Sequence, residues 1–100
     1  MSRAATSQEK AYLGRVAELG CVLCRRLGLG ASPAEVHHPR TGTGAGRRAS
    51  HYDAIPLCPY HHRSSNEALH AMGRKAWERH HGITELELVE QTQREAACPA

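Results

Sequence analysis

The chain has 100 residues and a net charge of +3, with one Trp, three Tyr and no Phe. This length allows one domain, near the lower limit at which a hydrophobic core is stable unaided. No apolar run reaches membrane-spanning length, and the first residues lack the apolar stretch of a signal peptide. We therefore expect a cytoplasmic protein without a membrane partner.

The basic residues are concentrated in the middle of the chain. Between Cys21 and Arg63 there are six arginines and two acidic residues, whereas residues 64–100 contain six acidic and four basic residues. Arginine binds phosphate oxygens in a bidentate geometry that lysine does not offer. The distribution favours a nucleic-acid partner, with a solvated basic face as the alternative.

A helix is predicted at the beginning of the chain. Thr6 and Glu9 fit a capping box, and apolar residues follow at helical spacing. These signals predict a helix from about Ser7 to Leu19, ended by Gly20.

The next segments predict two short strands. Residues 21–33 contain two glycines and are predicted to form a turn region, and residues 34–38 are a strand candidate. Residues 39–52 have three glycines and no large aliphatic side chain, which predicts a loop. A second strand is expected over residues 53–57, where Pro56 suits an edge strand.

Helices are predicted for the rest of the chain. Pro59 can occupy the first position of a helix that continues to Met72. Residues 74–81 predict a further short helix. Thr84 and Glu87 fit another capping box, which predicts a last helix to about residue 95, followed by a frayed tail at residues 96–100.

Two metal-ligand pairs share the spacing of zinc knuckles. Cys21 and Cys24 form one pair, and Cys58 and His61 form the other. Together they predict a closed tetrahedral Cys₃His zinc site, because a reducing compartment favours thiolate–metal bonds over disulfides. Ordinary buried cysteines are the alternative. Cys98 lies in the predicted tail and is expected to be a bystander.

Three histidines are left after the zinc ligands are assigned. His37 and His38 end the first predicted strand, and His62 lies at the start of the helix after the second strand. The end of such a strand and the first turn of such a helix lie side by side. The three side chains can therefore meet around a second metal with open positions, which suits hydrolysis. A surface or packing role is the alternative for each histidine.

The stretch "EVHHPRTGTG…HYDAIPLCPYHHR" resembles the HNH, or ββα-metal, endonucleases. The continuation "LHAMGRKAWERHHGITELEL" resembles the phage Ref branch of RecA-dependent recombination nucleases and related prophage proteins. The resemblance implies an α+β fold, namely a small ββα-metal domain stapled by zinc and flanked by helices. It implies one nuclease-like domain over residues 1–100, with a core at about residues 20–89.

The resemblance also assigns roles to the metal-ligand candidates. His38 matches the general base, and His37 and His62 match the ligands of the catalytic cation. The structural zinc ligands are matched by Cys21, Cys24, Cys58 and His61. The implied activity is hydrolysis of DNA phosphodiester bonds with Mg²⁺ or Mn²⁺, leaving a 5′-phosphate and a 3′-hydroxyl.

Further positions match the pattern in part. The usual middle Asn falls at Asp53, which is a departure. His51 is expected either to touch the metal or the scissile phosphate or to be exposed. His70 is expected either to contact the site or DNA or to lie on a helix surface. The arginines expected to contact DNA phosphates, with a plain solvent loop as the alternative, are Arg40, Arg47 and Arg48.

The implied biological role is DNA processing or recombination encoded by a phage or prophage. Its expected partners are DNA and a recombinase filament, or another DNA-processing protein of the phage or host. The main alternative is a zinc-stapled module that binds DNA or protein without cutting it. A metal-storage or metal-sensing protein is a second alternative, but it would not require a basic loop.

Overall fold

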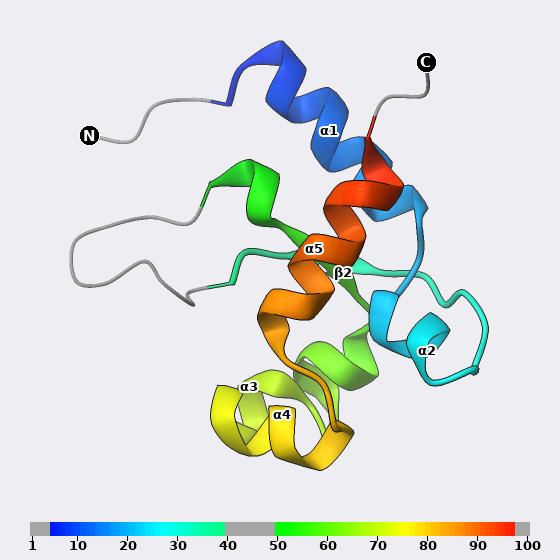
Figure 1. The fold of residues 1–100 in the computed structure, drawn as a ribbon, viewed down its shortest axis with the longest axis vertical. Coiled ribbons are helices and arrows are strands. Elements are labelled where there is room, and N and C mark those ends of the chain that lie inside the picture. The colour runs from blue at the N-terminus through cyan, green and yellow to red at the C-terminus, as the bar shows by residue number, and fades with distance from the viewer. Residues whose placement is uncertain (1–4, 40–49, 98–100) are drawn as a thin grey trace.

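A two-stranded antiparallel sheet lies among the helices of the fold (Figure 1). The computed structural model describes residues 5–39 and 50–97. Strand β1 (Glu35–His37) pairs with β2 (Ile55–Leu57), with Val36 opposite Pro56. Each strand of a two-stranded sheet has a free edge, so Pro56 removes no hydrogen bond that the fold needs. Both predicted strands are therefore present, although the second begins at Ile55 and not at residue 53.

Helix α1 (Ser7–Glu18) begins at the predicted capping box. The Thr6 hydroxyl accepts a hydrogen bond from the Glu9 backbone amide, and the Glu9 carboxylate accepts one from the Thr6 amide. Gly20 follows with a φ of 78°, a conformation that favours glycine. A Cβ at Gly20 would also lie 3.1 Å from the Ser32 carbonyl oxygen. The predicted beginning and end of this helix are confirmed to within one residue.

The predicted turn region begins with a short helix, α2 (Val22–Arg26). Cys21 precedes it as the N-cap, and the Cys21 sulfur accepts a hydrogen bond from the Cys24 amide. Val22 and Leu23 are fully buried. This single helical turn brings both cysteines of the first ligand pair to the same side of the backbone.

The helix predicted to run from Pro59 to Met72 is interrupted, and that prediction is wrong. A π-helical turn, η2 (Tyr60–Ser64), is followed by extended backbone at Ser65 with a φ of −135°. The Ser65 hydroxyl donates to the Tyr60 carbonyl and accepts from the Glu67 amide. Serine side chains compete with helical hydrogen bonds in this way, so the helix stops. Helix α3 (Leu69–Met72) begins after the break.

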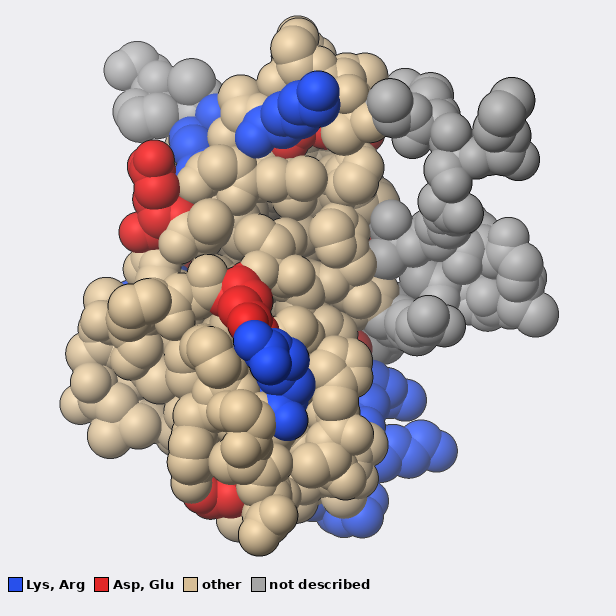
Figure 2. All heavy atoms as spheres, turned by 180° about the vertical axis from the view of Figure 1, so that it is seen from behind, with Lys and Arg blue, Asp and Glu red and all other residues tan. Residues whose placement is uncertain are grey.

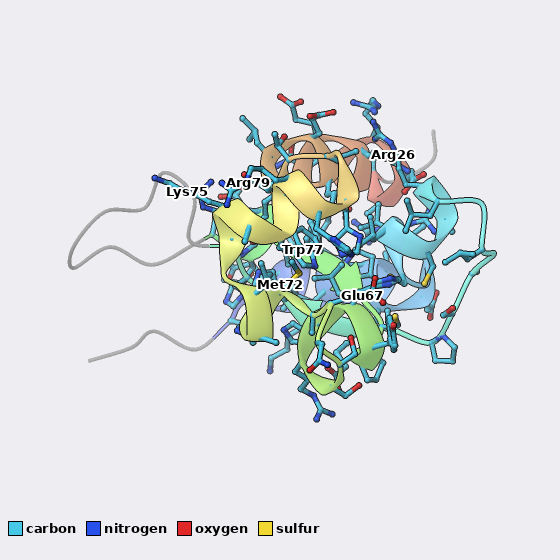
Figure 3. The ribbon with its side chains drawn as sticks, turned by 90° about the horizontal axis from the view of Figure 1, so that it is seen from below. Arg26, Glu67, Met72, Lys75, Trp77 and Arg79 are labelled. Atoms are coloured by element: carbon cyan, nitrogen blue, oxygen red, sulfur yellow. The ribbon has the colours of Figure 1, made fainter. Side chains whose placement is uncertain are left out.

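Two helices follow the break as predicted. Helix α4 (Arg74–His81) ends at Gly82, whose φ is 71°. Figure 3 shows Trp77 pointing from α4 toward the interior, where its side chain is fully buried. Helix α5 (Glu85–Ala96) packs against α1, α2 and β2. Its inner side chains and Trp77 share one core with Cys21, Cys24 and Cys58.

The chain ends differ in part from expectation. Ala96 belongs to α5 and is 1% exposed, so the predicted frayed tail does not begin there. Arg15 donates a hydrogen bond to the Ala96 carbonyl, which holds the end of α5 against α1. Cys98 lies outside the described residues. Within residues 5–39 and 50–97, no helix has both the length and the apolar character needed to cross a membrane.

The capping box of α5 gives the first testable prediction. The Thr84 hydroxyl accepts from the Glu87 amide at 3.1 Å, and Thr84→Ala removes this bond. We expect the free energy of unfolding to fall by about 1 kcal/mol. For a domain of this size that lowers Tm by roughly 4–8 °C in thermal circular dichroism of the zinc-loaded protein. Thr84→Ser keeps the hydroxyl, so equal losses in both variants would contradict the capping role.

Candidate functional site

The first metal-ligand cluster joins three segments of the fold. Cys21 and Cys24 come from the beginning of α2, Cys58 follows β2, and His61 lies in η2. All four residues are buried, with exposed fractions of 6% or less. Their ligand atoms lie within 4.8 Å of one another. The structure therefore brings together the four residues that the two spacings predicted.

The distances within this cluster fit a tetrahedral zinc ion. The Cys24 and Cys58 sulfurs are 3.7 Å apart, and each lies 3.4 Å from His61 Nδ1. The Cys21 sulfur lies 3.9 Å from the same nitrogen. Tetrahedral zinc with ordinary bond lengths requires about 3.8 Å between sulfurs and about 3.6 Å between sulfur and nitrogen. The cluster is thus a Cys₃His site that can hold a metal such as zinc.

Burial has an electrostatic consequence for these thiols. It is the main cause that raises the pKa of Cys21 to about 12, because a thiolate is poorly solvated there. Without a cation the group is therefore a neutral thiol at pH 7. Zinc binding must release protons from such groups, which couples the metal to the folded state.

A second cluster contains three histidines from three separate elements. His37 ends β1, His62 lies in η2, and His70 lies in α3. One ring nitrogen of each lies within 4.8 Å of the others. The ring centroids of His37 and His70 are 5.6 Å apart, and those of His37 and His62 are 5.1 Å apart. His70, whose role the sequence left open, therefore joins the predicted pair.

Two nitrogen atoms of this cluster are spaced as ligands of one cation would be. The Nε2 atoms of His62 and His70 are 3.0 Å apart. Two nitrogens about 2.1 Å from a shared cation are about 3.0 Å apart at a right angle and about 3.4 Å apart at a tetrahedral angle. His70 is exposed, whereas His37 is only 9% exposed. The cluster thus extends from the protein interior to the surface, where a substrate can approach.

Glu35 holds His62 from the side away from His70. A Glu35 oxygen lies 2.8 Å from His62 Nδ1, and the same carboxylate accepts hydrogen bonds from Arg63. First Arg63 and then His62 lower the pKa of Glu35 to about 2. The carboxylate is therefore ionised at neutral pH and can accept the Nδ1 proton of His62, which leaves Nε2 with a lone pair. Sequence analysis missed Glu35, although residues two apart on a strand share a face and Glu35 precedes His37 by two.

Glu85 makes the equivalent contact with His37. Its Oε2 lies 2.9 Å from His37 Nε2, and Glu85 is only 2% exposed. Sequence analysis missed this residue too. Glu85 lies 48 positions after His37 in the sequence. Its position in the first turn of α5 predicts only that its negative charge stabilises the beginning of that helix.

His38 is separated from the three-histidine cluster because neighbouring side chains on extended backbone point to opposite sides. Its Nε2 atom lies 3.1 Å from Nδ1 of His51, which belongs to the 3₁₀ turn η1 (His51–Asp53). Burial first, and then the neighbouring His51 and His37, lower the pKa of His38. The ring is therefore neutral at pH 7 and able to accept a proton.

The other residues predicted to contact the metal or DNA do not lie together. His51, for which contact with the metal or phosphate was one expectation, is partly buried and contacts His38. Asp53 accepts a hydrogen bond from Gln93 of α5 at 3.3 Å. Asp53 thus helps to join η1 to α5. The predicted phosphate contacts Arg40, Arg47 and Arg48 lie outside the described residues.

Charged side chains are spread over the described surface. Figure 2 shows a face that is mostly uncharged, with acidic and basic side chains in contact near its middle and basic side chains projecting along one edge. Figure 3 shows Lys75 and Arg79 extending outward from the same side of α4. Both are exposed and are four residues apart, so they form a short basic stripe. This helix directly follows α3, which carries His70.

One comparison with known proteins covers nearly the whole chain. Residues 5–96 match the model of a family described as "Recombination enhancement, RecA-dependent nuclease". The match extends from α1 to α5 and includes both histidine-containing clusters. The description indicates nuclease activity in recombination and involvement with RecA. A search of curated proteins finds no match.

Proposed function

The chain belongs to the family of RecA-dependent nucleases of recombination enhancement, and on that premise we propose that it is an HNH endonuclease dependent on a divalent cation. One observation carries the proposal. His37, His62 and His70 converge from three elements, and the half-buried His38 follows His37 directly. A purely structural zinc site has no use for this second cluster, whereas phosphodiester hydrolysis needs both a cation site and a base.

His38 is the proposed general base. With its Nε2 atom in contact with His51, its Nδ1 atom is the nitrogen that takes a proton from water. The water oxygen then forms a bond to phosphorus as the bond from phosphorus to the 3′ oxygen breaks. A proton returned to that oxygen completes a 3′-hydroxyl and a 5′-phosphate. His51 contributes by holding the His38 ring in place.

His37, His62 and His70 would hold the catalytic cation. When bound, it supplies positive charge that stabilises the phosphate and the leaving oxygen in the transition state. Three imidazole ligands suit Mn²⁺ or another transition metal better than Mg²⁺, which prefers oxygen. Cys21, Cys24, Cys58 and His61 would hold the structural zinc. The cation site would then adjoin a ββα unit formed by β1, β2 and η2, within a single domain.

The proposed substrate is DNA bound mainly through its phosphates. Lys75 and Arg79 offer cations beside α3, and the arginines of residues 40–49 would add others. Such contacts provide affinity without sequence readout. Since the family description names RecA, a RecA filament on DNA is the proposed partner. We propose a cytoplasmic protein of phage or prophage origin, on the basis of the Ref-like sequence.

A nicking assay on supercoiled plasmid tests this function. We expect the zinc-loaded protein to nick DNA when Mn²⁺ or Mg²⁺ is added, and to stop when the second cation is chelated. RecA filaments on a matching single strand should be included in a parallel reaction. Absence of cleavage with every divalent cation, with and without RecA, would overturn the proposal.

His70 gives a quantitative prediction for the cation site. His70→Ala removes an exposed ligand without opening the core, so the fold and the zinc content should not change. We expect the Mn²⁺ concentration for half-maximal nicking to rise by at least about 10–100-fold, the loss seen even when the partner of a metal ligand is changed. His80→Ala is the matched control, because His80 is an exposed histidine that contacts Glu67 instead. Equal Mn²⁺ requirements in the two variants would remove His70 from the site.

A further inference from the structure

The Glu85 carboxylate is buried, although a helix does not require a buried carboxylate in its first turn. It lies in the first turn of α5 with 2% of its surface exposed, and its Oε2 contacts His37 Nε2 at 2.9 Å. A carboxylate in a first turn also interacts favourably with the helix dipole when it is exposed, as Glu87 is. Burial of a charge carries a desolvation penalty, so the helix alone does not explain this position.

Several contacts hold Glu85 in this position. The Thr84 capping box fixes the beginning of α5, and the Glu85 amide donates to a Glu78 carboxylate oxygen at 2.7 Å. Leu88, one turn later, is fully buried in the core. Helix α5 also contacts β2 of the sheet (Figure 1). The carboxylate is therefore presented to His37 by a rigid element that lies outside the strands and η2.

The contact has a chemical consequence for His37. A neutral imidazole carries its proton on one nitrogen and a lone pair on the other. If Nε2 donates to Glu85, Nδ1 keeps the lone pair that a cation requires. Carboxylates that accept from a metal-bound histidine fix its orientation and increase its basicity.

The two histidine–carboxylate contacts select opposite tautomers. Glu35 contacts His62 at Nδ1, which leaves Nε2 directed at His70, whereas Glu85 contacts His37 at Nε2. The carboxylates beside His37 and His62 also place negative charge near the cluster. This charge favours a divalent cation over an empty cluster.

We infer that Glu85 is a positioning residue of the cation site, which fixes His37 in the tautomer that binds through Nδ1 and makes α5 part of that site. The inference rests on the proposed function, because it assumes a cation at His37, His62 and His70. Helix α5, which follows the segment that carries the three histidines, would thus also have a function at the cation site.

Titration of the zinc-loaded protein with Mn²⁺, followed by electron paramagnetic resonance of the free ion, tests this inference. Glu85→Gln keeps the size of the side chain and removes its charge. We expect the Mn²⁺ Kd to increase about 10–100-fold while zinc stays at one ion per chain. Saturating Mn²⁺ should restore the nicking rate, which a damaged fold would not allow. Glu90→Gln, an exposed change on the same helix, should leave the Kd unchanged.

Long-range ¹H–¹⁵N NMR of the wild-type protein gives a second test that needs no variant. With zinc bound and no second cation, His37 should show its proton on Nε2. A proton on Nδ1, or a Glu85→Gln variant with the wild-type Mn²⁺ Kd, would overturn the inference. Failure of the wild-type protein to bind Mn²⁺ or to cut DNA would instead overturn the proposed function.

Discussion

His38→Ala is expected to lower the rate of plasmid nicking by about 10²–10⁴-fold, the usual contribution of a positioned general base. The variant should keep its zinc and its affinity for Mn²⁺, because His38 belongs to neither metal-ligand cluster. Its side chain is half-buried after β1 and contacts His51, so its loss opens little of the core. The measurement is the initial nicking rate at saturating Mn²⁺ and DNA.

His80→Ala serves as the control for the loss of an imidazole from this histidine-rich chain. Its nicking rate should match that of the wild type, since His80 is exposed on α4 and contacts Glu67. If His38→Ala cuts as fast as His80→Ala at equal zinc content, His38 is not the base. A slow His38→Ala variant that has also lost zinc would not support the assignment, so zinc is measured in every preparation.

Removal of a metal held by the Cys₃His cluster is expected to unfold the protein. The cluster Cys21, Cys24, Cys58 and His61 joins α2, β2 and η2, and its cysteines belong to the main core. Zinc sites of this kind supply about 10–16 kcal/mol of apparent binding free energy at pH 7. A small domain stabilised by about 5–15 kcal/mol cannot lose such a contribution and remain folded. Chelation should therefore abolish the cooperative thermal transition in circular dichroism.

Cys24→Ser separates zinc loss from the action of the chelator. The variant should bind less than one zinc per chain and lack the native near-ultraviolet signal of Trp77, which is fully buried in the same core. Cys98→Ser is the matched control, because the sequence predicts Cys98 to be a bystander in the tail. A Cys24→Ser protein with the wild-type Tm would show that the cluster is not a structural metal site.

Local signals predicted much of this fold. The Thr6–Glu9 and Thr84–Glu87 capping boxes fixed the beginnings of α1 and α5 because each box lies within four consecutive residues. The residues of the Cys₃His cluster were predictable for a similar reason. A two-residue gap within each pair constrains its geometry, although the pairs are far apart in sequence.

The break after η2 and the partners of the histidines were not predictable in this way. A serine at position 65 is compatible with a helix, and only its hydrogen bonds to Tyr60 and Glu67 show that the helix stops. Contact of His70 with the site was one of two expectations, the other being a helix surface. His70 reaches His62 across the break between η2 and α3, which no helical spacing describes. Glu85 meets His37 only through the packing of α5, which no local pattern encodes.

The neighbouring residues His61 and His62 belong to different metal-ligand clusters, one facing the buried cysteines and the other facing His70. The number of residues between Cys58 and His61 is therefore constrained more tightly than the identity of those residues. Deleting one residue between Cys58 and His61 would move His62 into the position of His61, beside the cysteines, and Arg63 into the position of His62. Pro59 and Tyr60 are exposed, so other side chains can replace them. Natural variants should thus differ in the identity of these two residues but retain two residues between Cys58 and the histidine pair.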